Sequence, residues 1–237
     1  MPQDYSEAAR WYRKAAEQGH AGGQVGLGLM YLTGRGVPQD HAEALRWFRK
    51  AAEQGEAIAQ LTLGSMYEEG RGARQDYAEA VRWYREAAEQ GDDNGQFALG
   101  LMYNNGRGVK QDYAEALRWY RKAADQGNAA AQSNLGVMYA KGQGVPQDYA
   151  EAARWSRKAA DQGHPSAQAV LGAMYAEGQG VSQDYTAALT WFRKAADQGF
   201  AAAQGNLGYM YTNGQGAPQG LRRGAYVAEP CGFAHQW

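Results

Sequence analysis

The stretch from Asn128 to Gly163, NAAAQSNLGVMYAKGQGVPQDYAEAARWSRKAADQG, decides the fold, because near copies of it recur along the chain every 36 residues. The dipeptide Gln-Asp marks the register, and a tryptophan follows each of these glutamines eight residues later. The tryptophans are Trp11, Trp47, Trp83, Trp119, Trp155 and Trp191. A fixed period between about 20 and 50 residues is typical of repeat arrays, in which neighbouring units share a continuous core.

Each unit is predicted to contain two helices. Residues 57–67 place Ala59, Leu63 and Met66 three or four positions apart, which is the pattern of an amphipathic helix. A second helix is expected after Asp76, since Asp at the N-cap with Glu79 three residues later is a capping-box pattern. Two short helices joined by short connections predict an antiparallel hairpin that depends on its neighbours for stability. The chain is therefore expected to be all-α.

Three residue types inside the unit recur with the repeat. A glycine in each first helix costs about 1 kcal/mol relative to alanine, so we expect it to allow close approach of the second helix. These glycines are Gly28, Gly64, Gly100, Gly136, Gly172 and Gly208. The tryptophans share a helix face with alanines and are predicted to be packing residues. A glutamine recurs in each first helix, at Gln24, Gln60, Gln96, Gln132, Gln168 and Gln204. Its amide is expected either to bond neighbouring backbone or to form a ladder of peptide-binding groups.

The phrases AAAQxNLGxMYxxGQGVPQDY and AEAxRWYRKAAEQG, repeated in register over residues 1–219, resemble the Sel-one-like repeat, a longer-period relative of the tetratricopeptide repeat. The resemblance implies a right-handed α-solenoid of antiparallel helix hairpins, with the first helices lining a concave face. It also implies a bacterial protein that holds other proteins together. Cysteine-rich members of the family are linked to β-lactam binding. Because Cys231 is the only cysteine here, that activity is not carried over.

The array is expected to cover residues 1–219, as a half unit, five full units between 20 and 199, and a final first helix. The first helix of the third unit is expected to start late, because Asp92, Asp93 and Asn94 replace small apolar residues. Residues 220–237 abandon the repeat. Inserting one G into codons for the expected Gln-Asp-Tyr-Ala-Glu-Ala yields the observed Gln-Gly-Leu-Arg-Arg-Gly, so a frameshifted tail is predicted. Met1 aligns with Val37, which suggests a reading frame that continues upstream.

Composition weighs against several classes of function. The net charge of −1 gives no reason to expect nucleic-acid binding. No apolar run reaches the roughly 18 residues of a membrane helix, and no leader precedes the first repeat, so the compartment stays open. The scattered histidines lack metal-ligand spacing, and the Gly-Arg-Gly loops follow helices rather than strands, which disfavours a phosphate-binding loop. No cofactor, metal site or catalytic residue is predicted.

The candidate partner-binding residues are those that vary between otherwise similar first helices. Two positions one helical turn apart carry no charge in any unit, and the apolar face they form is predicted to bind a peptide or helix. Arginines in the adjoining loops are expected to favour acidic segments. The candidate residues are Val25, Leu29, Leu61, Ser65, Phe97, Leu101, Ser133 and Val137, with Arg35, Arg71 and Arg107.

The sequence thus predicts a non-enzymatic scaffold or adaptor that binds protein or peptide partners, with self-association through the incomplete C-terminal end. The alternative is a cell-envelope enzyme, or a peptidoglycan- or β-lactam-binding protein, of the same repeat family. A fragment without present function is the third interpretation.

Overall fold

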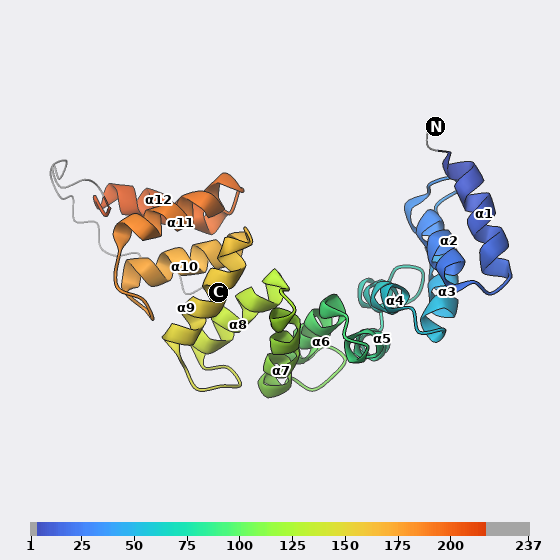
Figure 1. The fold of residues 1–237 in the computed structure, drawn as a ribbon, viewed down its shortest axis with the longest axis horizontal. Helices are drawn as coiled ribbons and strands as arrows, with labels where there is room; N and C mark the ends of the chain where they lie inside the picture. The colour runs from blue at the N-terminus through green and yellow to red at the C-terminus, as the bar shows by residue number, and fades with distance from the viewer. Residues whose placement is uncertain (1–3, 217–237) are drawn as a thin grey trace. The chain divides into compact units, whose positions relative to one another are not determined.

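The computed structural model describes residues 4–216, and this part of the chain contains twelve helices and no strands. Figure 1 labels them in chain order. They are α1 Tyr5–Glu17, α2 Ala21–Thr33, α3 His41–Glu53, α4 Ala57–Glu69, α5 Tyr77–Glu89, α6 Asp93–Asn105, α7 Tyr113–Asp125, α8 Ala129–Lys141, α9 Tyr149–Asp161, α10 Pro165–Glu177, α11 Tyr185–Asp197 and α12 Ala201–Thr212. The all-α fold of 36-residue helix hairpins is confirmed. The predicted frameshifted tail and Met1 lie outside the described residues.

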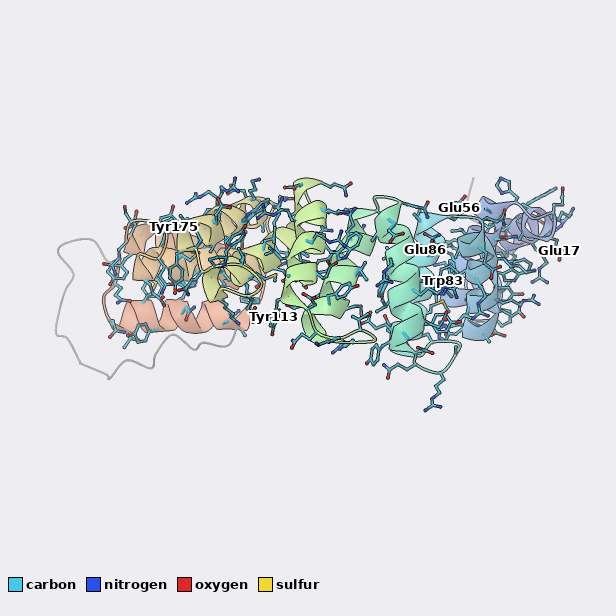
Figure 2. All side chains as sticks on the ribbon, turned by 90° about the horizontal axis from the view of Figure 1, so that it is seen from below. Glu17, Glu56, Trp83, Glu86, Tyr113 and Tyr175 are labelled. Carbon is cyan, nitrogen blue, oxygen red and sulfur yellow. The ribbon has the colours of Figure 1, made fainter. Side chains whose placement is uncertain are left out.

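The chain divides into two compact units, Met1–Trp119 and Tyr120–Trp237, with the boundary inside α7. Consecutive helices pack against each other from α1 to α6 in unit 1 and from α8 to α12 in unit 2. We call α2, α4, α6, α8, α10 and α12 the first helices of the repeat and the remaining six the second helices. Trp83 and Glu86, both labelled in Figure 2, illustrate the amphipathic second helix α5, because Trp83 is buried and Glu86 is exposed.

Aspartates begin the second helices, as the sequence predicts. The Asp76 carboxylate accepts hydrogen bonds from the backbone N–H groups of Ala78 and Glu79 at 2.9 and 3.1 Å. Such a cap stabilises a helix by about 1 kcal/mol. The glutamate does not complete a capping box. Instead Glu79 lies 3.6 Å from Arg82, one turn further along the helix.

The first helix of the third repeat, α6, does not start late, so that prediction is wrong. The helix α6 begins at Asp93, in the same register as the other first helices. The reason is Asp92, whose side chain accepts a 2.6 Å hydrogen bond from the Gly95 N–H. The cap lets polar residues occupy the first turn. His20 and His164 cap α2 and α10 in the same way through Nδ1, a role that the sequence reading missed.

The helix glycines mark close packing, as predicted. A Cβ added at Gly64 would stand 2.6 Å from the ring of Tyr84, and one at Gly172 would stand 2.8 Å from the ring of Phe192. Neither helix pair could keep its spacing with a larger residue, because real contacts of Cβ atoms are not that short. In α12, by contrast, a Cβ built at Gly208 would meet no atom within 4 Å among the described residues outside its own helix backbone.

The recurrent glutamines bond the backbone and one another. Gln60, 3 % exposed, donates from Nε2 to the Ala52 carbonyl at 3.1 Å. Its Oε1 accepts from Gln90 Nε2 at 2.7 Å. The same pair of bonds joins Gln168 to Ala160 and to Gln198. The first of the two sequence alternatives is thus supported. Buried amides that are hydrogen-bonded through both the nitrogen and the oxygen stabilise one packing geometry.

Candidate partner-binding site

Unit 1 holds six of the eight candidate helix residues, and most of them are half-buried. Val25 and Leu61 pack against the core of unit 1, while Leu29 is 40 % exposed. Ser65, Phe97 and Leu101 are also half-buried. We call these six residues the variable stripe of unit 1. It is an apolar face that is partly covered by its neighbours.

Unit 2 treats the same register differently. Ser133 on α8 is buried, and Val137 one turn later is half-buried. Further along, Ala169 and Ala173 of α10 are both buried in the core of unit 2. On α8 and α10 the stripe is therefore less accessible than on the first helices of unit 1, whereas on α12 Gly205 is exposed and Tyr209 is half-buried.

The three loop arginines are exposed, but each has a partner inside the chain. Arg71 Nε lies 2.6 Å from Glu69 Oε2. Arg107 Nη1 lies 3.5 Å from Glu68 Oε1. The guanidinium of Arg35 stands over the ring of Tyr5, 5.4 Å from its centre. An acidic partner segment would have to compete with these contacts, which are weak at exposed sites.

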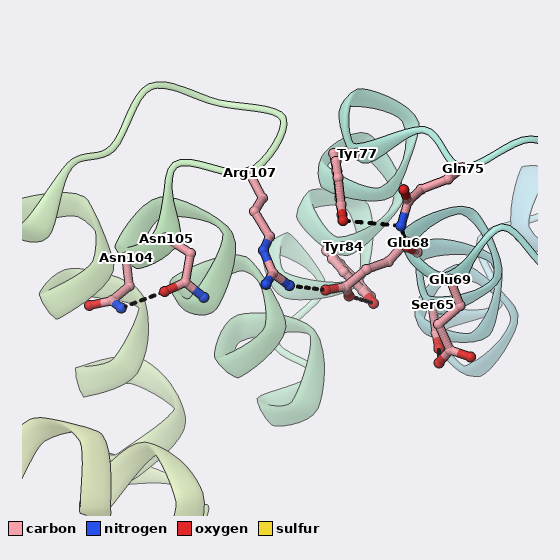
Figure 3. Close-up of polar contacts among 9 residues, drawn as sticks. All are labelled: Ser65, Glu68, Glu69, Gln75, Tyr77, Tyr84, Asn104, Asn105 and Arg107. Carbon is pink, nitrogen blue, oxygen red and sulfur yellow. Dashed lines mark hydrogen bonds and ion pairs between the residues drawn. The ribbon is translucent and has the colours of Figure 1, made fainter. Parts of the chain in front are cut away.

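Glu68 organises a polar cluster that the sequence reading missed (Figure 3). It accepts a 2.8 Å hydrogen bond from the Tyr84 hydroxyl, and Arg107 approaches it from the loop after α6. Burial raises the pKa of Tyr84, and the hydrogen bond to Glu68 raises it further, so the phenol stays protonated and donates. Next to this cluster, Ser65 Oγ lies 3.0 Å from Glu69 Oε1.

A departure from the repeat could have revealed this cluster. Glu68 is the only charged residue at its position in the 36-residue repeat. The other first helices carry Leu32, Asn104, Ala140, Ala176 and Thr212 there. Sequence alone does not show that Arg107, 39 residues away, reaches it. The cluster borders the variable stripe, since Ser65 of the stripe bonds Glu69, the residue next to Glu68.

The tryptophans are packing residues, as predicted. Trp47, Trp83, Trp119, Trp155 and Trp191 are buried. Trp11 is the exception and is 58 % exposed. It lies on α1, which is not preceded by a first helix among the described residues.

The described residues contain no group of three or more His, Cys, Asp or Glu side chains placed to hold a metal ion. Of the helices between residues 4 and 216, none combines the length and apolar character needed to cross a membrane.

Comparisons with known proteins agree with the helix pattern. The Sel1 repeat profile matches residues 1–20, 21–56, 57–92, 94–128, 129–164, 165–200 and 201–226. Among curated proteins, none matches the sequence. A Sel1 repeat protein from Oxalobacter formigenes is 34 % identical with a TM-score of 0.80, and the alignment covers 91 % of both chains.

A second structure, a protective antigen of uropathogenic Escherichia coli strains with an SLR fold, is 47 % identical with a TM-score of 0.85. The alignment covers 89 % of this chain but spans only 45 % of that protein. The repeat profile matches nearly every residue, and the relative from Oxalobacter matches along 91 % of its length. This chain belongs to the Sel1 repeat family.

Proposed function

We propose that this protein is a non-enzymatic scaffold that binds a peptide or helical segment of a partner protein on the first-helix face of unit 1. Sel1 repeat proteins are generally protein-interaction scaffolds. The observation that carries the proposal for this chain is the variable stripe of unit 1. Leu29 is exposed, and Leu61, Phe97 and Leu101 are half-buried. All four stand at positions whose residue changes from one 36-residue repeat to the next, while the packing residues around them stay the same.

Apolar character at these positions favours an interface over idle surface. Surface residues that vary without selection for contact are commonly charged, whereas an accessible apolar stripe on a soluble protein usually marks an interaction site. Glu69 and Arg71 lie at the edge of the stripe, and both are exposed. They supply a polar rim, which gives orientation and specificity rather than most of the affinity.

The experiment is a peptide selection on the purified chain, followed by titration of the selected peptide against variants. Replacing Phe97 and Leu101 together by Asp should weaken binding by at least about tenfold, because two apolar contacts become charged. Leu29→Asp is the milder variant, since Leu29 is already exposed. Circular dichroism would check that each variant stays folded.

Ile58→Asp is the matched control. Ile58 is also a large apolar residue on α4, it is 62 % exposed, and it lies outside the stripe. Binding should survive that substitution. If the stripe variants bind as tightly as the wild type, or if Ile58→Asp weakens binding equally, the stripe is not the binding site.

The envelope-enzyme alternative has no observation on residues 4–216 in its favour, so the scaffold is proposed alone. Hydrolysis of nitrocefin, or clearing of a cell-wall suspension, by the purified chain at low concentration would overturn this choice.

Self-association at the C-terminal end belongs to the same proposal. Among the described residues, a Cβ built at Gly205 or Gly208 of α12 would meet no atom within 4 Å outside the helix's own backbone, and Tyr211 is 55 % exposed. The equivalent tyrosines Tyr67 and Tyr139 are buried.

A further inference from the structure

The variable stripe of unit 1 ends at a carboxylate. On α4 the stripe residues Leu61 and Ser65 are followed by Glu68, and residues at these spacings lie on one face of a helix. The position of Glu68 is taken by Leu32 on α2 and by Asn104 on α6. The stripe and this third level of the first helices in unit 1 therefore hold one charged side chain, that of Glu68.

The Glu68 carboxylate is held in place through one of its oxygens. Oε2 accepts the 2.8 Å hydrogen bond from the Tyr84 hydroxyl, and Tyr84 is only 3 % exposed on α5. The Tyr84 ring is in turn fixed by its close packing on Gly64. The Glu68 side chain is still 29 % exposed, so a partner can reach it. Binding at this carboxylate costs little side-chain entropy, because Tyr84 already orders it.

The other oxygen of Glu68 is only weakly engaged. Arg107 Nη1 lies 3.5 Å from Oε1, whereas charge-assisted hydrogen bonds are about 2.7–2.9 Å long. The Arg107 side chain is 52 % exposed, and its guanidinium lies over the Tyr77 ring, 5.8 Å from the ring centre. Figure 3 shows Arg107 and Tyr84 approaching the same carboxylate. Because exposed ion pairs contribute little, Arg107 can leave Oε1 at a small cost.

We propose that Glu68 binds a lysine or arginine of a partner segment whose apolar side chains lie on the variable stripe. This inference rests on the proposed function and names the chemistry of the partner at the same site. Leu61 lies seven residues before Glu68, which is about 10 Å along a helix. The partner therefore carries its basic residue at that distance from the apolar residue that meets Leu61. In a partner helix that runs along the stripe, the two residues are seven positions apart.

Charge complementarity favours a basic segment over an acidic one. The loop arginines attract carboxylates, but Arg71 already lies 2.6 Å from Glu69 Oε2, and Arg107 stands beside Glu68. A partner carboxylate at Arg107 would approach the carboxylate that Tyr84 holds in place, and like charges brought together repel. A partner cation at Oε1 meets no fixed like charge, because the exposed Arg107 can turn toward solvent.

The experiment selects helical peptides from one random library on the purified chain and, separately, on Glu68→Gln. Peptides selected on the wild type should share apolar residues and a lysine or arginine at a constant spacing from them. Peptides selected on Glu68→Gln should keep the apolar residues and lose the basic one. The glutamine oxygen still accepts a hydrogen bond from Tyr84 but carries no charge.

Calorimetric titration then measures the contribution of the basic residue. One peptide selected on the wild type is compared with a version in which its basic residue is glutamine. This replacement should weaken binding to the wild type by about tenfold, the effect of one charge-assisted hydrogen bond. Binding to Glu68→Gln should differ between the two peptides by less than about twofold. The comparison on the wild type requires no protein variant, so it stands even if Glu68→Gln fails to fold.

Glu56→Gln is the matched control. Glu56 is exposed, it lies at the opposite end of α4, and its side chain makes no capping hydrogen bond. Figure 2 labels this residue. The substitution removes the same charge from the same helix, and the preference for a basic residue should survive it. Arg107→Gln should tighten binding of the basic peptide by about two- to fivefold, because a competing cation is removed.

The outcomes separate this inference from the proposed function. If the selected peptides do not depend on Phe97 and Leu101, the proposed function fails, and this inference fails with it. If they depend on both residues but carry no basic residue, or prefer an acidic one, only the inference about Glu68 is overturned. The inference is also overturned if Glu56→Gln removes the preference for a basic residue as fully as Glu68→Gln does.

Discussion

In the hairpin α4–α5 of unit 1, the ring of Tyr84 fills the space beside Gly64, whereas in the hairpin α8–α9 of unit 2, Ser156 stands at that register beside Gly136. The atoms nearest to a Cβ built at Gly64 all belong to the Tyr84 ring. At Gly136 the Ser156 Oγ would overlap such a Cβ, and backbone atoms of Ala152 and Ser156 come within 3.3 Å. Beside the smaller side chain, backbone atoms of α9 are thus among the nearest neighbours of the Gly136 position.

The difference shows what the repeated glycine permits. The position opposite this glycine accepts either an aromatic ring or a serine, because glycine presents no side chain in both cases. Only the aromatic solution places a hydroxyl near the end of the first helix, where Tyr84 meets Glu68. Variation inside the packing register therefore changes the polar surface next to the variable stripe of unit 1.

Removing the ring from unit 1 should have the largest effect. Tyr84→Ser should lower the free energy of unfolding by about 3–5 kcal/mol, since α4 and α5 are not spaced for a small residue. Urea unfolding followed by circular dichroism measures the loss, and hydrogen exchange should place it in α4 and α5. Tyr211→Ser, at an exposed tyrosine, is the control and should cost little. An unchanged unfolding midpoint for Tyr84→Ser would show that the ring does not fill this space.

Adding a ring to unit 2 should cost less but still destabilise the protein. Ser156→Tyr should lower the free energy of unfolding by about 1–3 kcal/mol, because overpacking forces the backbones of α8 and α9 apart. Ser156→Ala is the matched variant. The Ser156 hydroxyl is buried without a hydrogen-bond partner, so its removal should be neutral or stabilising. Stabilisation by Ser156→Tyr would reveal unfilled space and contradict the comparison.

The hydroxyl of Tyr84 can be tested separately from its ring. Tyr84→Phe should cost about 1–2 kcal/mol, the range for a hydrogen bond to a partly exposed carboxylate. The ring itself is retained, as Phe48 shows in α3. A double-mutant cycle with Glu68→Gln should give a coupling energy above about 0.5 kcal/mol. Additive effects of the two substitutions would mean that the contact between Tyr84 and Glu68 contributes nothing.

The helices that follow the two hairpins should respond differently to acid, with the smallest effect. Asp92 caps α6, whereas His164 caps α10 with Nδ1 accepting from the Ala167 N–H at 3.3 Å. Burial lowers the pKa of His164, so the folded state favours the neutral ring that can accept this bond. The unfolded chain takes up the proton first as pH falls through about 6.5, so stability present above that pH is lost below it.

Replacing the histidine by asparagine isolates this effect. His164→Asn should flatten this part of the pH dependence, because Asn128 caps α8 without a titrating group. The change should be smaller than the loss of a whole cap, which is about 1 kcal/mol. Hydrogen exchange at the start of α10, measured at pH 7 and pH 5, tests the prediction. Equal acid sensitivity in the wild type and the variant would exclude His164 as its source.

Much of the fold follows from the sequence alone, because the determining interactions are local or repeat with the period. Helix bounds follow from the apolar spacing and from caps such as Asp76, only a few residues away. The roles of Gly64 and of Trp83 follow from their recurrence, since a costly or bulky residue that recurs in register must serve the packing between units. The start of α6 is the exception, because the Asp92 side chain caps the helix and lets it begin in register despite its polar first turn.

The candidate site depended more on tertiary structure. Sequence identified which first-helix positions vary, but it could not show that Leu29 is exposed while Ser133 is buried, because the neighbouring helices decide exposure. Nor could it show that Arg107 meets Glu68, which lies 39 residues earlier. A single-chain pattern records what repeats. The contacts of residues that depart from the repeat are fixed only when distant segments fold against each other.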